Sequence, residues 1–398
     1  MVLRAFFVGL ALIFVGSAAP AQATGNFAKC VADKWPAAKR KGVTRATFNA
    51  ATKGLKPDEL TLKRSRNQAE FVKPIWEYLD TAVSARRIKN GRAALNKHLP
   101  VLKEIARRYR VDPEVVVAIW GMESSYGFNT GDRNAIQASA TLACISRRRA
   151  KFWTDQFVAA MKIAQDGHVP LKQMSSSWGA AMGHTQFIPT SWQAYAADYD
   201  GDGKRDIWRS IPDALASTAN YLNKFGYRYQ QTWGYEVRVP SGFKHTLADG
   251  RKKRALSEWS RYGIKRANGK PWPRPNDQAY LLYPGGANGP AFLMLPNFDV
   301  IKRYNNADAY ALAVGHLADR IIGGNAFEQS WPRDERPLSR KEVREMQSLL
   351  TRRGYPTGGI DGRVGPKTRG AIRAYQSARG KVPDGFASSK LLADLKRR

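Results

Sequence analysis

Residues 115–127 read V-V-V-A-I-W-G-M-E-S-S-Y-G, an apolar run that ends in the glutamate Glu123. The run follows Asp112-Pro113, a pair that predicts a helix start because aspartate can cap free amides and proline suits the first turn. A helix through this stretch turns the Glu123 carboxyl toward the same face as Val116 and Trp120. The segment therefore predicts a helix that carries a carboxyl on its apolar side.

An inward-facing carboxyl is unusual and has two interpretations. Burial raises the pKa of a carboxyl by desolvating its charged form, and a raised pKa is what a general acid needs near neutral pH. The alternative is a structural glutamate paired with an arginine. No other acidic residue follows Glu123 until Asp132. Glycosidases ordinarily use two carboxylates, and the sequence identifies no partner for Glu123. A glycosidase built on Glu123 would therefore use one carboxyl, and the sugar would supply its own nucleophile.

The surrounding chain predicts a mainly α fold with a small β insertion. Apolar residues recur at helical spacings through most of residues 27–322, for example in Pro100–Tyr109 and Pro113–Met122. The pattern changes between residues 232 and 295. The expected strands are Tyr235–Val239, Gln278–Leu282 and Ala291–Leu295, with Gly285–Gly289 as the hairpin loop between the last two.

The C-terminal part predicts a separate small unit. Residues 323–337 combine glycine, proline and charges without an apolar period, which is typical of a linker. Residues 338–398 contain three short apolar stripes and therefore predict three helices. A weak internal repeat, Asp361-Gly362 and Asp384-Gly385, recurs within them. So small a unit suits binding better than catalysis.

The first 23 residues have the layout of a secretory signal, with Arg4, an apolar stretch and small residues at Ala21 and Ala23. The apolar stretch is too short to span a membrane comfortably. We therefore expect an exported, soluble, periplasmic protein without a membrane anchor after cleavage. Cys30 and Cys144 are the two cysteines of the chain, and export favours a disulfide between them over a buried free pair.

The net charge of +32 implies an acidic partner. So basic a chain commonly indicates nucleic-acid binding. Here, however, the basic residues are scattered and no groove-reading motif is present. With an export signal, the partner is expected in the cell envelope, and we expect no nucleic-acid binding.

Three separated motifs resemble the B-type lytic murein transglycosylases. They are E-S-S-Y-G at 123–127, S-W-G-A-A-M-G-H-T-Q-F-I-P-T-S-W at 177–192 and Y-N-N-A-D-A-Y at 304–310. The resemblance implies a lysozyme-like α+β catalytic domain over residues 24–322. It also implies that Glu123 protonates the glycosidic oxygen between muramic acid and glucosamine. The same residue then deprotonates the muramyl 6-hydroxyl, which gives a 1,6-anhydro end without water.

The resemblance also implies the substrate-binding residues. Ser177 and Gln186 match polar contacts near the muramyl residue, and Tyr304 and Asn305 match positions in the cleft. Further expected cleft positions are Tyr78, Tyr221 and Tyr310, and the basic pair Arg148 and Arg149 suits peptide carboxylates. Core packing is the alternative for the tyrosines. His184 and Thr185 lie in the second motif and receive no role.

Residues 198–206, D-Y-D-G-D-G-K-R-D, have the spacing of an EF-hand calcium loop. The twelfth position is Arg209 instead of glutamate, and the resemblance implies that Asp213 replaces it. The expected ligands of a structural Ca²⁺ are Asp198, Asp200, Asp202, Asp206, Asp213 and the carbonyl of Lys204. A capped, Asp/Gly-rich turn over residues 198–213 is the alternative. No cofactor is expected for catalysis.

The C-terminal unit, residues 338–398, resembles the peptidoglycan-binding domain of cell-wall hydrolases through M-Q-S-L-L, I-D-G-R-V-G-P-K-T and I-R-A-Y-Q. The resemblance makes peptidoglycan glycan strands the expected partner of a monomeric enzyme. A hydrolytic muramidase that uses the same Glu123 and a non-catalytic wall-binding protein are the competing interpretations.

Overall fold

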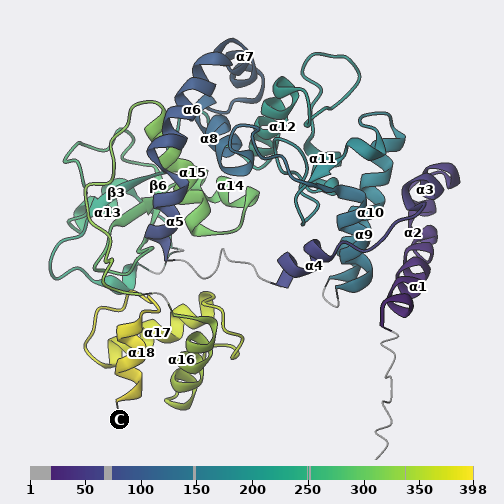
Figure 1. The fold of residues 1–398 in the computed structure, drawn as a ribbon. Helices are drawn as coiled ribbons and strands as arrows, with labels where there is room; N and C mark the ends of the chain where they lie inside the picture. The colour runs from purple at the N-terminus through teal and green to yellow at the C-terminus, as the bar shows by residue number, and fades with distance from the viewer. Residues whose placement is uncertain are drawn as a thin grey trace, which may run out of the picture.

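The computed structural model describes residues 19–66, 74–146, 149–248, 250, 252–336 and 338–397. The expected export signal, residues 1–23, lies mostly outside the described residues, and the first helix begins at Ala19. None of the described helices is long and apolar enough to cross a membrane. The fold is mainly helical with small sheets, as the sequence predicted. Figure 1 shows the helices and strands with the labels used below.

The helices are α1 (Ala19–Ala32), α2 (Trp35–Arg40), α3 (Arg45–Thr52), α4 (Glu59–Arg66), α5 (Ile75–Ala82), α6 (Ala85–Lys97), α7 (Leu99–Tyr109), α8 (Pro113–Ser124), α9 (Ala135–Ile145), α10 (Ala150–Gln165), α11 (Pro189–Tyr195), α12 (Ile211–Lys224), α13 (Leu256–Arg261), α14 (Pro296–Tyr304), α15 (Asp308–Ile321), α16 (Arg340–Arg352), α17 (Pro366–Ala378) and α18 (Ser389–Lys396). The strands are β1 (Arg133–Asn134), β2 (Ser175–Ser176), β3 (Gly234–Arg238), β4 (Arg254–Ala255), β5 (Lys265–Arg266), β6 (Gln278–Leu282) and β7 (Ala291–Met294).

Helix α8 lies at the centre of the largest core. Every residue from Val115 to Gly121 is buried, because α15, α6, α12 and α7 pack around the helix. The apolar run is therefore a helix buried on all sides, with no polar face until its last turn. Glu123 follows this buried run along the helix, so it lies where the core ends.

Helix α8 begins at Pro113, as predicted, but its expected side-chain cap does not form. Asp112 occupies the N-cap position, but its side chain makes no capping hydrogen bond. Its carboxylate instead accepts hydrogen bonds from the Tyr227 hydroxyl at 2.9 Å and from the Gln230 backbone N–H at 3.1 Å. The Asp112 carboxylate therefore binds the loop that follows α12 instead of the helix start. The local sequence does not reveal this tertiary contact.

The β insertion forms where the periodicity changes. Its five-stranded sheet has the order β4-β6-β7-β3-β5, and all four pairings are antiparallel. Strands β6 and β7 form the predicted hairpin, with Tyr280 opposite Met294. The sheet and α13 enclose a second apolar core around Trp259 and Leu293.

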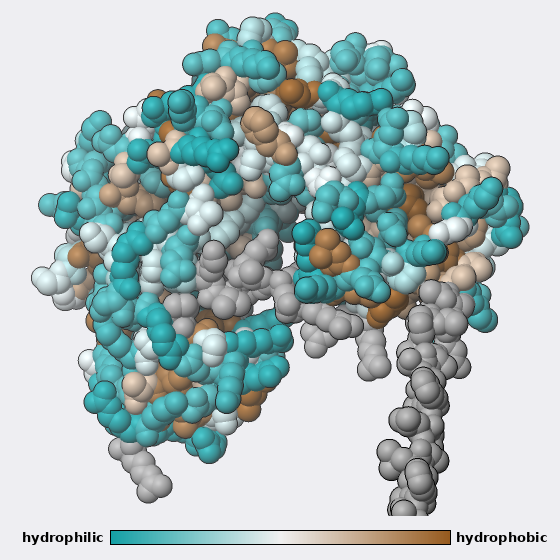
Figure 2. Space-filling model, viewed as in Figure 1, coloured by the Kyte–Doolittle hydropathy of each residue, from teal (hydrophilic) through white to brown (hydrophobic). Residues whose placement is uncertain are grey.

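The C-terminal helices α16, α17 and α18 enclose a third, separate core that includes Met346 and Ile372. All three helices were predicted from the apolar stripes. Figure 1 shows them, in green to yellow, gathered next to the sheet of the β insertion and away from α1–α4. Hydrophilic side chains cover most of the face shown in Figure 2, with apolar residues in small separate patches.

Candidate active site

Glu123 lies in the last turn of α8, half-buried at the edge of the core. The helix ends abruptly after it, because Ser125 and Tyr126 adopt left-handed backbone conformations with φ of 52° and 63°. Two consecutive residues of this kind that are not glycine are costly and persist only where the surroundings demand them. The turn directs the chain away from α8 and leaves Glu123 at the helix end.

The ring of Tyr126 holds this turn in place. Its hydroxyl donates to the backbone carbonyl of Arg87 on α6 at 2.8 Å. The ring fits between α6 and α8 because Gly91 and Gly121 lack side chains. A Cβ at either glycine would lie about 2.6 Å from the tyrosine. Neither glycine was predicted as part of the site, although both make room for the ring that holds the turn after Glu123.

Tyr310 contacts Glu123 directly. The Tyr310 hydroxyl, on the first turns of α15, donates a 2.6 Å hydrogen bond to Oε1 of Glu123. Burial first and the Glu123 carboxyl second raise the pKa of Tyr310 well above its ordinary value. The phenol therefore keeps its proton and acts as a fixed donor to the carboxyl.

Two further predicted tyrosines belong to the same cluster. The Tyr304 hydroxyl donates to the Thr185 carbonyl at 2.7 Å, and burial followed by the Glu123 charge raises its pKa. Tyr78 on α5 is close enough for its charge to raise the pKa of Tyr310. The structure thus brings tyrosines from α5, α14 and α15 together around Glu123.

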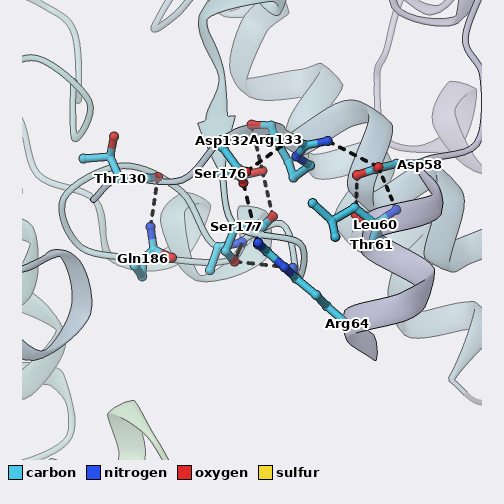
Figure 3. Close-up of polar contacts among 12 residues, drawn as sticks. Asp58, Leu60, Thr61, Arg64, Thr130, Asp132, Arg133, Ser176, Ser177 and Gln186 are labelled. Carbon is cyan, nitrogen blue, oxygen red and sulfur yellow. Dashed lines mark hydrogen bonds and ion pairs between the residues drawn. The ribbon is translucent and has the colours of Figure 1, made fainter. Parts of the chain in front are cut away.

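Ser177 and Gln186 lie on the loop that follows β2 (Figure 3). Ser177 Oγ accepts the backbone N–H groups of Gly179 and Ala181, at 3.3 and 3.4 Å. Gln186 has a positive φ of 52°, and its side-chain amide donates to the carbonyls of Thr130 and Gly183 at 3.1 and 2.9 Å. Both side chains therefore shape this loop. The Ser177 hydroxyl can still donate a hydrogen bond to a ligand, and the Gln186 side-chain carbonyl can accept one.

His184, to which the sequence analysis gave no role, joins this loop to α8. Its Nδ1 accepts the indole N–H of Trp120 at 3.0 Å, and its backbone carbonyl accepts the Ser124 hydroxyl at 2.9 Å. Burial lowers the pKa of His184, so the ring is neutral at pH 7. No spacing in the sequence indicates this contact, because the two partners are 64 positions apart.

The remaining predicted residues are placed less directly. Tyr221 is buried in an aromatic group with Phe187 and Tyr304, and its hydroxyl donates to the Arg303 carbonyl, so it supports the cluster from behind. Asn305 follows α14 directly and is half-buried. The exposed Arg149 lies over the ring of Phe152 at 3.9 Å. Arg148 lies outside the described residues.

The acidic loop brings three of its predicted ligands together. Carboxylate oxygens of Asp198, Asp200 and Asp202 lie within 4.8 Å of one another. Asp198 accepts the backbone N–H groups of Gly201 and Gly203, and the φ angles of these glycines, 78° and 83°, allow the tight turn. Three converging carboxylates are a donor set that suits a hard ion such as Ca²⁺.

Three other predicted ligands are held in other ways. Asp206 accepts the Arg209 guanidinium at 2.8 Å, and Asp213 accepts the backbone N–H groups of Tyr199 and Asp206 at 2.9 and 2.8 Å. Lys204 donates its backbone N–H to Asp202. The structure does not group Asp206 and Asp213 with the other three carboxylates. Their hydrogen bonds close the loop from its two ends.

A disulfide joins Cys30 on α1 to Cys144 on α9, with 5.9 Å between their Cα atoms. The bond fixes α1 to α9, which in turn packs against α10. The described residues contain no other cysteine.

The chain matches two protein families. The family described as "Transglycosylase SLT domain" matches residues 26–319, and the family described as "Putative peptidoglycan binding domain" matches residues 339–395. The membrane-bound lytic murein transglycosylase B of Escherichia coli K12 is 28% identical over 249 residues. That match covers 61% of this chain and 66% of the E. coli protein.

Solved structures agree with these matches. SltB3 from Pseudomonas aeruginosa in complex with a NAG-NAM-pentapeptide is 46% identical, with a TM-score of 0.90 over 93% of this chain and 99% of the other. An E. coli lytic transglycosylase in complex with calcium is 26% identical, with a TM-score of 0.62 over 75% of this chain and 93% of the other. The chain therefore belongs to the lytic transglycosylases of the SLT domain family and carries a peptidoglycan-binding domain.

Proposed function

We propose that Glu123 is the single acid and base with which this lytic transglycosylase cleaves the β-1,4 bond between N-acetylmuramic acid and N-acetylglucosamine. As the acid, Glu123 gives its proton to the glycosidic oxygen, and the bond from that oxygen to muramyl C1 breaks. As the base, it takes the proton of the muramyl 6-hydroxyl, whose oxygen bonds to C1. The ring closes to a 1,6-anhydro end, Glu123 regains its proton, and no water is consumed.

The Tyr310–Glu123 hydrogen bond is the observation that carries this assignment. A single carboxyl must be charged between the two proton transfers, and a fixed phenol donor stabilises that charge. Because Tyr310 has a strongly raised pKa, it does not give up its own proton in the exchange. The donor is bound at Oε1, so it also holds the carboxyl in one orientation.

Asp132 supports a mechanism with one carboxyl, because it is unsuited to be a second. Its carboxylate pairs with Arg133 at 3.2 Å and with Arg64 at 3.8 Å (Figure 3), and the Arg133 hydrogen bond lowers its pKa. A carboxylate whose pKa is lowered by paired arginines is a weak base and a weak nucleophile, which are the two roles open to a second carboxylate. The solved complexes of SltB3 with NAG-NAM-pentapeptide and NAG-anhNAM-pentapeptide support the same bond and the same type of product.

The residues around Glu123 are assigned by their position. Tyr78, Tyr304 and Asn305 would contact the sugar from one side, and Ser177 and Gln186 from the loop after β2. Tyr221 would act through Tyr304, which it packs against at 4.9 Å between ring centroids. The exposed Arg149, and Arg148 beside it in the chain, would meet carboxylates of the peptide stem.

The acidic loop is proposed to bind a structural Ca²⁺. Asp198, Asp200 and Asp202 would supply carboxylates and Lys204 its carbonyl, while Asp206 and Asp213 brace the loop. The calcium complex of an E. coli relative supports this assignment. The ion would stabilise the loop and take no part in the reaction.

Export and domain organisation complete the proposal. Residues 1–23 would direct the chain to the periplasm, where an oxidising environment sustains the Cys30–Cys144 disulfide. Residues 24–322 would form the catalytic domain, 323–337 the linker and 338–398 the wall-binding domain. The separate cores support this division.

Digestion of purified peptidoglycan in water enriched in heavy oxygen tests the reaction. We expect 1,6-anhydromuramyl products without label at the new muramyl end. The Glu123→Gln variant should lose activity by at least about 10²–10⁴-fold, the contribution of general acid–base catalysis. Labelled reducing ends as the main product would establish a hydrolytic muramidase instead. Full cleavage by Glu123→Gln would remove this residue from the mechanism.

A further inference from the structure

The C-terminal domain is built from two copies of one unit. In the first copy, Gln347 on α16 donates to Asp361 Oδ1 at 3.0 Å and accepts the Gly362 N–H at 2.9 Å. In the second, Gln376 on α17 donates to Asp384 Oδ1 at 2.7 Å and accepts the Gly385 N–H at 2.9 Å. The Asp-Gly repeat visible in the sequence is therefore a repeat of the structure.

Arginines occupy equivalent positions in the two copies. Arg340 precedes Gln347 by seven residues, and Arg369 precedes Gln376 by seven. Each arginine backbone carbonyl lies against the glycine of its own copy, at 3.0 and 3.1 Å from the place where a glycine Cβ would be. Arg340 and Arg369 thus occupy equivalent positions in the two copies of the unit, but their surroundings differ.

The second copy rests on the β insertion. Asp384 Oδ2 accepts the backbone N–H of Ala287, in the loop between β6 and β7, at 2.9 Å. The ring of Phe386 lies beside Gly286, about 3.0 Å from the place where a glycine Cβ would be. Lys390 on α18 also bridges to Asp334 and Glu335. These contacts give the domain one defined position next to the sheet (Figure 1).

A groove of about 630 Å³ lies along this junction, a size within the usual range for ligand sites of about 300–1,000 Å³. One wall comes from the catalytic part of the chain and the other from α17. The residues that line it are Gly250, Lys253, Tyr280, Leu282, Asp299, Lys302, Asp308, Pro366, Arg369, Gly370 and Arg373.

The groove has an excess of positive charge among these residues. Lys253 pairs with Asp299 at 3.0 Å and Lys302 with Asp308 at 2.6 Å, so the catalytic wall is close to neutral. The wall formed by α17 adds the cationic side chain of Arg369 and no lining carboxylate. Guanidinium groups recognise carboxylates through paired hydrogen bonds.

We propose that this groove binds a second peptide stem of peptidoglycan, separate from the stem that would meet Arg148 and Arg149, through its carboxylates, with Arg369 as a direct contact. The proposal rests on the proposed function. A stem combines acidic groups with small apolar side chains, and the lining of the groove combines Arg369 with Leu282, Pro366 and Tyr280. Asp308 also begins α15, which carries Tyr310, so the groove adjoins the helix that serves the catalytic carboxyl. A stem held here would keep its glycan strand near the active site.

Binding of a synthetic stem pentapeptide to the full chain, measured by calorimetry, tests this proposal. The Arg369→Glu variant is compared with Arg340→Glu, which makes the same charge change at the equivalent position of the first copy. We expect Arg369→Glu to weaken binding by 10-fold or more and Arg340→Glu to leave it within about twofold. Raising the salt should weaken wild-type binding, because the contacts are charged. A pentapeptide with amidated carboxylates should bind at least 10-fold more weakly.

Equal weakening by both arginine variants, or equal binding of the amidated peptide, would overturn the proposal. Inorganic phosphate that displaces the peptide at equal concentration would also overturn it, since the groove would then be a general anion site. Cleavage of peptide-free glycan to the anhydro product is measured in parallel with the wild type and with Arg340→Glu, which lies outside the groove, and the two should match. That control separates this inference from the proposed function, which would fail if no anhydro product were formed at all.

Discussion

Tyr310 donates a 2.6 Å hydrogen bond to Glu123 from a helix that lies 187 positions later in the chain. The carboxyl comes from the end of the buried helix α8 and the phenol from α15, which packs along it. The geometry of the proposed reacting centre is therefore a property of the α8–α15 contact. It is as rigid as the core on which it is built.

Replacing Tyr310 with phenylalanine should lower the rate and leave the fold intact, because only the hydroxyl is lost. A hydrogen bond to a charged group contributes about 1.5–3 kcal/mol, so we expect a loss of roughly 10–100-fold in kcat. Release of soluble muropeptides from sacculi measures it. Tyr221→Phe is the matched control, since that hydroxyl bonds to a backbone carbonyl away from Glu123. A Tyr310→Phe rate equal to the wild type would show that the hydrogen bond has no role in turnover.

The disulfide should contribute to stability by limiting the unfolded chain. Its half-cystines are 114 residues apart, and loss of a native bridge of this kind costs about 2–5 kcal/mol. The Cys30→Ser, Cys144→Ser double variant should unfold at lower denaturant concentration. The wild type under reducing conditions should behave in the same way. If both midpoints match that of the oxidised wild type, the bridge does not stabilise the fold.

Calcium removal should destabilise the wild type, because an ion that binds only the folded chain raises the unfolding free energy by mass action. We expect a lower Tm with excess chelator and recovery when calcium is restored. The Asp200→Asn, Asp202→Asn double variant should show a low Tm in both conditions. Asp155→Asn, which changes a half-exposed side chain on α10, should respond like the wild type. A chelator response that persists in the double variant would place the ion elsewhere.

Most of the fold could be predicted from local patterns. The helical periodicity predicts α7, α8 and the three C-terminal helices, and alternation predicts β3. Two short apolar runs around a glycine-rich loop predict the β6–β7 hairpin. The prediction that Asp112 caps α8 was wrong. The backbone N–H groups at the start of the helix compete with Tyr227 and Gln230 for this one carboxylate. The local sequence shows the acceptor, Asp112, but not the distant donors that bind it.

Less of the site could be predicted, for a related reason. The motif around Glu123 indicates the carboxyl, yet the Tyr310 and His184 contacts join residues far apart in the chain. Gly91 and Gly121 are ordinary helix residues in the sequence and acquire a role only when the Tyr126 ring lies between them. Such contacts depend on how helices cross, which periodicity does not specify.

Asp319 should make stability depend on pH. Burial raises its pKa to about 7, against the opposing hydrogen bond from Trp233. Between pH 4 and 7 the folded state therefore binds more protons than the unfolded state, and this group lowers the unfolding free energy as pH rises through that range. Asp319→Asn keeps an acceptor for Trp233 and removes the titration. Its stability relative to the wild type should rise from pH 4 to pH 8 in urea unfolding. A difference that does not change with pH would contradict this, and Asp155→Asn controls for the loss of charge.

His184 should act as a positioning residue through its Nδ1. The Trp120 N–H is buried beside it, and removing its acceptor leaves an unsatisfied donor at a cost of about 1–3 kcal/mol. The ring also lies against Gly127, where a Cβ would be 2.4 Å from Cε1, so it fixes the turn that follows Glu123. His184→Ala should therefore lower kcat by roughly 10-fold and change KM little.

The conservative variant separates the hydrogen bond from simple packing. Asparagine can place its Oδ1 near the position of Nδ1, so His184→Asn should recover most of the rate, whereas His184→Leu fills the space without an acceptor and should resemble His184→Ala. The lowered pKa of His184 makes a second readout. Acid that protonates Nδ1 breaks the Trp120 bond in the wild type, so kcat should fall as pH decreases below the His184 pKa. This decrease should be absent in His184→Asn, which has no group that titrates there. Equal rates for the alanine and asparagine variants would show that the ring only fills space.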